Sequence, residues 1–196
     1  MTPQTTRIVT VIAAFLGGLV LFSAAIFMVT GRAPVPAPSS IGGPFRLVDQ
    51  NGQVVTEAAL NGKPSLIFFG FTHCPDICPT ALFDMTQVFK ALGKDGDKVQ
   101  AYFVSVDPER DTPEILKEYL SSFDPRLRGL TGDPAAVAAM EKAYRVYSKK
   151  IPLENGGYTM DHTALVYLMD KQGRFVAPFN MKRKPEEAAA ELKRYF

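Results

Sequence analysis

An uninterrupted apolar run, Ser65–Phe71 (SLIFFGF), constrains the fold of this chain more than any other feature of its sequence. A strand with one face in water alternates polar and apolar residues, whereas this run predicts a strand that is buried on both faces. Val99–Val106 (VQAYFVSV) has a similar character, and Thr80–Leu92 between them carries apolar residues at helical spacing. The three segments therefore predict a strand, a helix and a second buried strand.

The remaining segments complete a mixed sheet. Asn51-Gly52 predicts the turn of an N-terminal hairpin, and turn residues at 170–173 predict an antiparallel pair near the C-terminus. The other expected strands are Phe45–Leu47, Val54–Val55, Leu127–Leu130, Thr163–Met169 and Phe175–Pro178, and the other expected helices are 113–123, 134–147 and 185–196. This order of elements predicts an α/β fold, a thioredoxin-like mixed sheet with helices on both faces and an N-terminal hairpin extension.

The N-terminal part of the chain has a different character. Residues 8–31 form an uncharged, mostly apolar segment of 24 residues, which at about 1.5 Å per residue is long enough to cross the roughly 30 Å hydrocarbon core of a bilayer. We therefore expect a cytoplasmic N-terminus at 1–7, a transmembrane anchor at 8–31, a Pro/Ala/Ser/Gly linker at 32–44 and a domain at 45–196. A cleaved signal peptide is the alternative for the apolar segment.

Composition limits the chemistry that the domain can carry. Lysine and arginine total 22 against 20 acidic residues, a near balance that gives no strong positive field, so we expect no nucleic-acid partner. The chain has only two cysteines and two histidines. Any soft-metal or thiol chemistry must therefore use these four side chains.

Both cysteines, Cys74 and Cys78, stand where the predicted strand Ser65–Phe71 gives way to a helix. Ligands collect at this end of strands in open α/β sheets, and a helix N-terminus favours thiolate over thiol. On one helical turn the two alpha carbons would lie about 6 Å apart, which suits a shared metal ion and also a disulfide. The pair is predicted to bind metal or to be redox-active; a purely structural disulfide is the alternative.

Two thiolates leave a soft ion such as copper(I) one ligand short of a trigonal site, and a neutral imidazole is the usual complement. His162 directly precedes the predicted strand Thr163–Met169, after a polar loop at 149–157. In a thioredoxin-type sheet this position faces the start of the cysteine helix. We therefore predict a copper ion, copper(I) or alternatively copper(II), held by Cys74, Cys78 and His162. His73 is expected to point away, because it adjoins Cys74.

Three motifs together resemble the Sco/SenC family of copper-binding assembly proteins for cytochrome c oxidase. They are GFTHCPDICP at 70–79, SVDPERDTPE at 105–114 and DHT at 161–163. The resemblance implies a thioredoxin-like copper metallochaperone that assists assembly of the dinuclear copper centre of the oxidase. It also implies three partners, namely the copper-bearing oxidase subunit, a copper donor protein and a thiol reductant. The domain would then lie in the bacterial periplasm or the mitochondrial intermembrane space, and the protein would be a carrier rather than an enzyme.

Other functions stay open on the residues alone. A thiol-disulfide oxidoreductase that reduces the cysteines of the copper target is the main alternative, and a copper or redox sensor would use the same site. A peroxide-reducing enzyme fits less well. Peroxiredoxins resemble one another in a threonine three residues before the reactive cysteine, whereas Thr72 lies two residues before Cys74. Asp107 and Asp111 follow the second buried strand. Asp107 is a weaker site candidate, either at a docking surface or in helix capping.

Overall fold

A computed structural model describes residues 13–24, 41–154 and 156–196. Residues 13–24 form a helix. The rest of the predicted anchor at 8–31, the N-terminus at 1–7 and linker residues 32–40 lie outside the described residues. Within the described ranges, no helix combines the length and the apolar character needed to cross a membrane.

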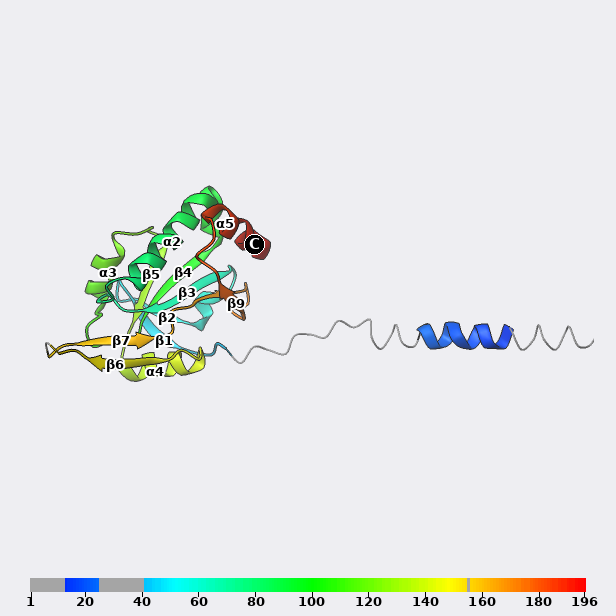
Figure 1. The fold of residues 1–196 in the computed structure, drawn as a ribbon, viewed down its shortest axis with the longest axis horizontal. Coiled ribbons are helices and arrows are strands. Elements are labelled where there is room, and N and C mark those ends of the chain that lie inside the picture. The colour runs from blue at the N-terminus through cyan, green and yellow to red at the C-terminus, as the bar shows by residue number, and fades with distance from the viewer. Residues whose placement is uncertain (1–12, 25–40, 155) are drawn as a thin grey trace, which may run out of the picture. The chain divides into compact units, whose positions relative to one another are not determined.

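The domain is built on a seven-stranded mixed sheet with the order β2-β1-β5-β4-β3-β8-β9 (Figure 1). Its strands are β1 (Arg46–Asp49), β2 (Val54–Thr56), β3 (Ser65–Gly70), β4 (Gln100–Ser105), β5 (Leu127–Thr131), β8 (Val166–Met169) and β9 (Phe175–Phe179). Strands β3, β4 and β5 run parallel, whereas the other neighbouring pairs are antiparallel. A separate antiparallel hairpin consists of β6 (Ser148–Pro152) and β7 (Tyr158–His162).

Four α-helices connect and cover the strands. They are α2 (Ile77–Leu92), α3 (Pro113–Leu120), α4 (Pro134–Ala143) and α5 (Pro185–Leu192), with 3-10 turns at η1 (Glu57–Leu60), η2 (Gly93–Lys98) and η3 (Lys193–Tyr195). The side chain of Thr112 accepts a hydrogen bond from the Ile115 amide and so caps α3, and the side chain of Asp133 accepts one from Ala135 and caps α4. Figure 1 shows α2 and α5 together on one side of the sheet and α4 on the other.

Strand β3 explains why both faces need cover. All six of its residues are buried, and successive side chains point to opposite faces. Phe68 packs near Phe103 on one face, whereas Phe69 packs near Tyr144, the residue that follows α4, on the other. A strand with large aromatic residues on both faces is stable only as an internal strand between two layers of helices, as the sequence predicted.

The predicted thioredoxin-like arrangement is confirmed, with three corrections. The predicted loop at 149–157 is shorter than expected, because residues 149–152 belong to β6, which pairs with β7. Helix α2 begins at Ile77, three residues before the predicted start. The helix that begins at Pro134 ends at Ala143 and not at Tyr147, because Arg145 has a φ of +57° and turns the chain away from the helical path.

The end of the predicted linker already contacts the domain. The Gly42 amide donates a hydrogen bond to the carbonyl of Ala143 at 2.9 Å. Ile41 packs against the core, and Phe45 is buried within it. The packed structure therefore begins several residues before position 45.

A buried carboxylate, Asp49, fixes the hairpin to the sheet. Its Oδ1 accepts hydrogen bonds from the amides of Asn51 and Gln53, both at 2.9 Å, and its Oδ2 accepts one from Arg128 Nη2 of β5 at 2.9 Å. Burial alone would raise the pKa of this carboxyl. The hydrogen bonds from Gln53, Arg128 and Asn51 outweigh burial, so the pKa of Asp49 lies below its ordinary value.

We predict that Asp49→Asn lowers the free energy of unfolding by roughly 1–3 kcal/mol at neutral pH, because a charged acceptor for three donors is lost. The folded pKa is lowered, so the stabilisation is full above the unfolded pKa of about 3.9 and fades as the pH falls through the folded value. Urea unfolding of both proteins between pH 3 and 7 measures this. A difference in stability that does not shrink in acid would contradict the assignment.

Candidate metal centre

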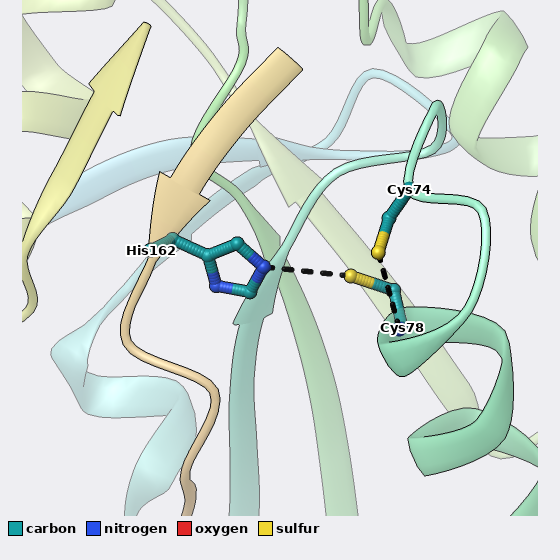
Figure 2. Close-up of side chains that lie close together, drawn as sticks. All are labelled: Cys74, Cys78 and His162. Atoms are coloured by element: carbon teal, nitrogen blue, oxygen red, sulfur yellow. Dashed lines mark hydrogen bonds between the residues drawn. The ribbon is translucent and has the colours of Figure 1, made fainter. Parts of the chain in front are cut away.

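Three side chains from distant parts of the chain meet at one end of the parallel strands. The Sγ atoms of Cys74 and Cys78 and a ring nitrogen of His162 all lie within 4.8 Å of one another (Figure 2). Cys78 Sγ is 3.7 Å from His162 Nε2, and the Cys78 amide donates a hydrogen bond to Cys74 Sγ at 3.4 Å. The structure thus brings together the three residues that the sequence analysis singled out.

The two cysteines occupy different local structures. Cys78 lies in the first turn of α2, but Cys74 precedes the helix and lies in the loop after β3, where its amide donates to the carbonyl of Phe71 at 3.3 Å. The expectation that the two cysteines lie on one helical turn is therefore wrong. Their proximity arises because the loop folds back over the helix start, and the two thiols are free.

Gly70, the last residue of β3, makes room for the buried sulfur. A Cβ atom at this position would lie 2.7 Å from Phe103 Cε2 and 2.8 Å from Cys78 Sγ. Both distances are shorter than van der Waals contact allows, so any side chain here would displace the Cys78 thiol or the Phe103 ring. Only glycine lets α2 carry its cysteine this close to the end of β3.

The imidazole is oriented by the backbone of the next residue. His162 is the last residue of β7, and its Nδ1 lies 3.1 Å from the carbonyl oxygen of Thr163. A carbonyl only accepts, so Nδ1 carries the proton and Nε2 presents its lone pair to Cys78. Burial lowers the pKa of His162, which keeps the ring neutral and able to bind a metal at neutral pH. Phe71 packs edge-on against this ring.

The two sulfurs differ in exposure. Cys78 is fully buried, whereas Cys74 is half-buried and faces a small hollow of about 260 Å³ that His162 also lines. Burial raises the pKa of the Cys78 thiol. A metal that binds Cys78 must displace its proton, so acid disfavours binding. Cys74 and His162 therefore face the hollow, whereas Cys78 is covered.

The donor set fits a small thiophilic ion. Bonds of about 2.0–2.3 Å to nitrogen and sulfur place the donors of a trigonal site roughly 3.5–4 Å apart, and Cys78 Sγ and His162 Nε2 lie 3.7 Å apart. The other two separations between ligand atoms are at most 4.8 Å, so each needs to shorten by less than about 1 Å. Two thiolates and one imidazole favour copper(I) or zinc over the hard cations that prefer oxygen ligands.

One carboxylate, Asp111, holds the cysteine loop. Its Oδ2 accepts hydrogen bonds from the Thr72 amide at 3.0 Å and from Ser105 Oγ at 2.6 Å, and its Oδ1 accepts one from Thr72 Oγ1 at 2.6 Å. Asp111 is fully buried. These bonds tie the loop that carries Cys74 to the end of β4.

A second carboxylate, Asp107, lies in the same β4–α3 loop as Asp111 and holds the hairpin that carries His162. Tyr158 donates its hydroxyl proton to Asp107 Oδ1 at 2.8 Å, and Arg110 Nε donates to Asp107 Oδ2. The Arg110 guanidinium stacks on the Tyr158 ring at 3.8 Å and also donates to the Tyr158 carbonyl at 3.0 Å. Burial and the hydrogen bond to Asp107 raise the pKa of Tyr158 to about 12, so the phenol stays a donor.

These contacts correct one expectation, the docking surface, and show two supporting residues that the sequence analysis did not single out. Asp107 is 1% exposed and Asp111 is fully buried, so neither forms a docking surface. Tyr158 and Arg110 support the site from elements far apart in the sequence, and only their folded positions show it. His73 lies outside the cluster, exposed, with Nδ1 3.1 Å from Thr72 Oγ1.

Comparison with known proteins assigns the chain to a family. The sequence profile described as SCO1/SenC matches residues 34–196. The chain belongs to this family. The structure of ScoI from Bradyrhizobium japonicum, which has copper bound, is 67% identical with a TM-score of 0.78 and covers 80% of this chain and 99% of that one.

Two further relatives are more distant. The mitochondrial protein SCO2 of Saccharomyces cerevisiae is 46% identical over 140 residues, which are 70% of this chain and 46% of the yeast protein. BsSco, a member of the Sco family of cytochrome c oxidase assembly proteins in which a disulfide switch was identified, is 25% identical. Its TM-score is 0.63 over 83% of this chain and 98% of that one.

We predict that Tyr158→Phe loosens the β6–β7 hairpin without unfolding the domain. Loss of the hydrogen bond to Asp107 costs about 1 kcal/mol, which corresponds to roughly fivefold faster amide hydrogen exchange in β6 and β7. Exchange measured by NMR tests this. Tyr147→Phe is the matched control, because Tyr147 is 52% exposed and its hydroxyl makes no hydrogen bond within the described residues. Equal exchange in both variants would contradict the role of Asp107.

Proposed function

We propose that this chain is a copper metallochaperone that holds one copper(I) ion with Cys74, Cys78 and His162. The observation that carries the proposal is the convergence of two sulfurs and an unprotonated imidazole nitrogen within 4.8 Å. A copper-bound relative with 67% identity supports copper as the ion. A site with two thiolates and one neutral imidazole has a net charge of −1 with copper(I), and the N-terminus of α2 stabilises that charge.

We further propose that the ion is cargo for the copper-bearing subunit of cytochrome c oxidase, delivered during assembly of its dinuclear copper centre. The link to the oxidase rests on the family of which BsSco is a member. The site suits transfer because one of its three ligands, Cys74, is partly exposed while Cys78 is buried. An incoming thiolate can approach on the Cys74 side while Cys78 and His162 still hold the ion.

The location of the domain is part of the same proposal. A membrane anchor at 8–31, a linker at 32–44 and a periplasmic or intermembrane-space domain at 45–196 suit delivery to a membrane-bound oxidase, with residues 1–7 in the cytoplasm. The uncharged length of 8–31 supports an anchor. Sedimentation of the full chain with membranes after carbonate washing tests it, and recovery in the wash would argue against an integral anchor.

We predict one copper(I) per reduced domain, measured by competition against a chromogenic copper(I) chelator. Cys78→Ser and His162→Ala each remove one ligand and are expected to weaken binding at least about 100-fold, more than loss of an outer residue typically costs. His73→Ala is the control, because His73 is exposed and outside the cluster. It should bind copper(I) as the wild type does. Wild-type copper(I) affinity in Cys78→Ser or His162→Ala would contradict the three-ligand site.

Thiol-disulfide exchange is a second candidate, favoured by the partial exposure of Cys74 beside a second thiol, Cys78, whose amide donates a hydrogen bond to Cys74 Sγ. In this reaction the Cys74 thiolate attacks a target disulfide, and the Cys78 thiol then resolves the mixed disulfide. The products are a reduced target and a Cys74–Cys78 disulfide.

We predict that the reduced, copper-free domain reduces a disulfide-bonded oxidase copper subunit only slowly. The buried resolving thiol of Cys78, with its raised pKa, is a poor nucleophile. Free thiols that appear on the target over time, with Cys74→Ser as the blank, measure the rate. Reduction as fast as copper transfer would favour the exchange function over the carrier function.

A further inference from the structure

An open groove begins beside the candidate metal centre and leads away from it along α2. It has a volume of about 550 Å³ and lies between the N-terminal half of α2, the start of β8 and the connection from β9 to α5. The smaller hollow at Cys74 and His162 shares Asp76, Ile77 and Ala164 with it. The two hollows are therefore neighbours along one surface, and the smaller one contains the exposed side of Cys74.

The groove leaves apolar side chains unpartnered. Ile77 is 54% exposed and Leu165 is 47% exposed, one on each wall, and Met181 lies half-buried farther along. Large apolar residues that gather in a concave surface mark binding sites more often than scattered ones do.

The groove carries negative charge, which favours an occupant with a basic side chain. Asp84 lies half-buried on the α2 wall, and its side chain makes no hydrogen bond or ion pair within the described residues. Burial raises the pKa of this carboxyl. Asp76 adds a second carboxylate to the same wall, and Lys182 is the one basic residue among the described residues that line the groove. A carboxylate held in an apolar groove is best satisfied by a guanidinium or ammonium group from outside.

We propose that this groove is the docking site for the copper-receiving protein, which lays an extended loop along it. An apolar side chain of the loop packs between Ile77 and Leu165, a basic side chain pairs with Asp84, and a thiol of the same loop reaches Cys74. The proposal rests on the proposed carrier function. It assigns to the groove a step separate from metal binding, because Asp84 is not among the three donor residues.

The test uses residues 38–196, because the described residues from 41 onward have a hydrophobic core of their own and the Bradyrhizobium chain that matches this region is covered to 99% of its own length. The domain, labelled with ¹⁵N, is titrated with the reduced, copper-free soluble domain of the oxidase copper subunit from the same organism. We expect amide shifts to concentrate at the groove, at Ile77, Asp84, Leu165 and Met181. The dissociation constant should rise with salt concentration.

Two substitutions sharpen the test. Asp84→Arg reverses the charge and is expected to weaken binding about tenfold or more, while the nearly isosteric Asp84→Asn weakens it about threefold and guards against a folding defect. Glu118→Arg is the matched control, because Glu118 is an exposed acid on α3 whose side chain makes no hydrogen bond or ion pair within the described ranges. It should bind as the wild type does. Chelator competition should give the same copper(I) affinity for all three variants.

The outcomes separate this proposal from the carrier function. Unchanged binding in both Asp84 variants, shifts on another surface, no association, or self-association of the domain through the groove would each overturn the docking site. A domain that binds the oxidase subunit through the groove but takes up no copper(I) would overturn the carrier function and leave the docking site standing. Tight copper(I) binding without amide shifts in the groove would overturn the docking site and leave the carrier function standing.

Discussion

The geometry of the candidate centre depends on two buried carboxylates in one short loop. Asp111 holds the loop of Cys74, and Asp107 holds the hairpin of His162 through Tyr158 and Arg110. Burying a carboxylate is costly unless it is hydrogen-bonded, and each of these has donors on both oxygens. Both carboxylates lie between β4 and α3, so the Cys74 loop and the His162 hairpin are anchored to the same loop at the end of β4. This loop therefore helps to set the spacing between the Cys74 thiol and the imidazole, whereas Cys78 is placed by α2.

The sequence predicted the fold well where burial dominates. Strand β3 has no polar side facing water, and the run of apolar residues identifies it without any structure. The β6–β7 hairpin was missed for the opposite reason. Its residues 148–152 and 158–162 are mostly exposed or half-buried, so they carry no apolar alternation. Their pairing is supported by contacts of Tyr158 with Asp107 and Arg110, which lie about fifty positions away in the sequence.

The candidate site was predictable in its members and not in its architecture. The cysteine spacing and the position of His162 before a strand were sufficient to name three residues. They were not sufficient to place Cys74 outside the helix or to show which sulfur is buried, because both depend on the path of the loop after Phe71. The sequence alone left the loop of Asp107 and Asp111 between a docking surface and helix capping, because carboxylates are usually exposed and no sequence pattern marks these two as buried. Only the folded positions of Thr72 and Tyr158 explain their burial.

Gly70 has a consequence for how such a centre could arise or be transplanted. The residue has no side chain to bind a metal, carry a charge or pack, yet the space that the missing side chain leaves is occupied in part by the Cys78 sulfur. Copying the two thiols and the imidazole onto another sheet of the same topology would fail wherever the preceding strand ends in a bulkier residue. In an evolutionary sequence of steps, the small residue at the strand end has to come before the cysteine on the helix.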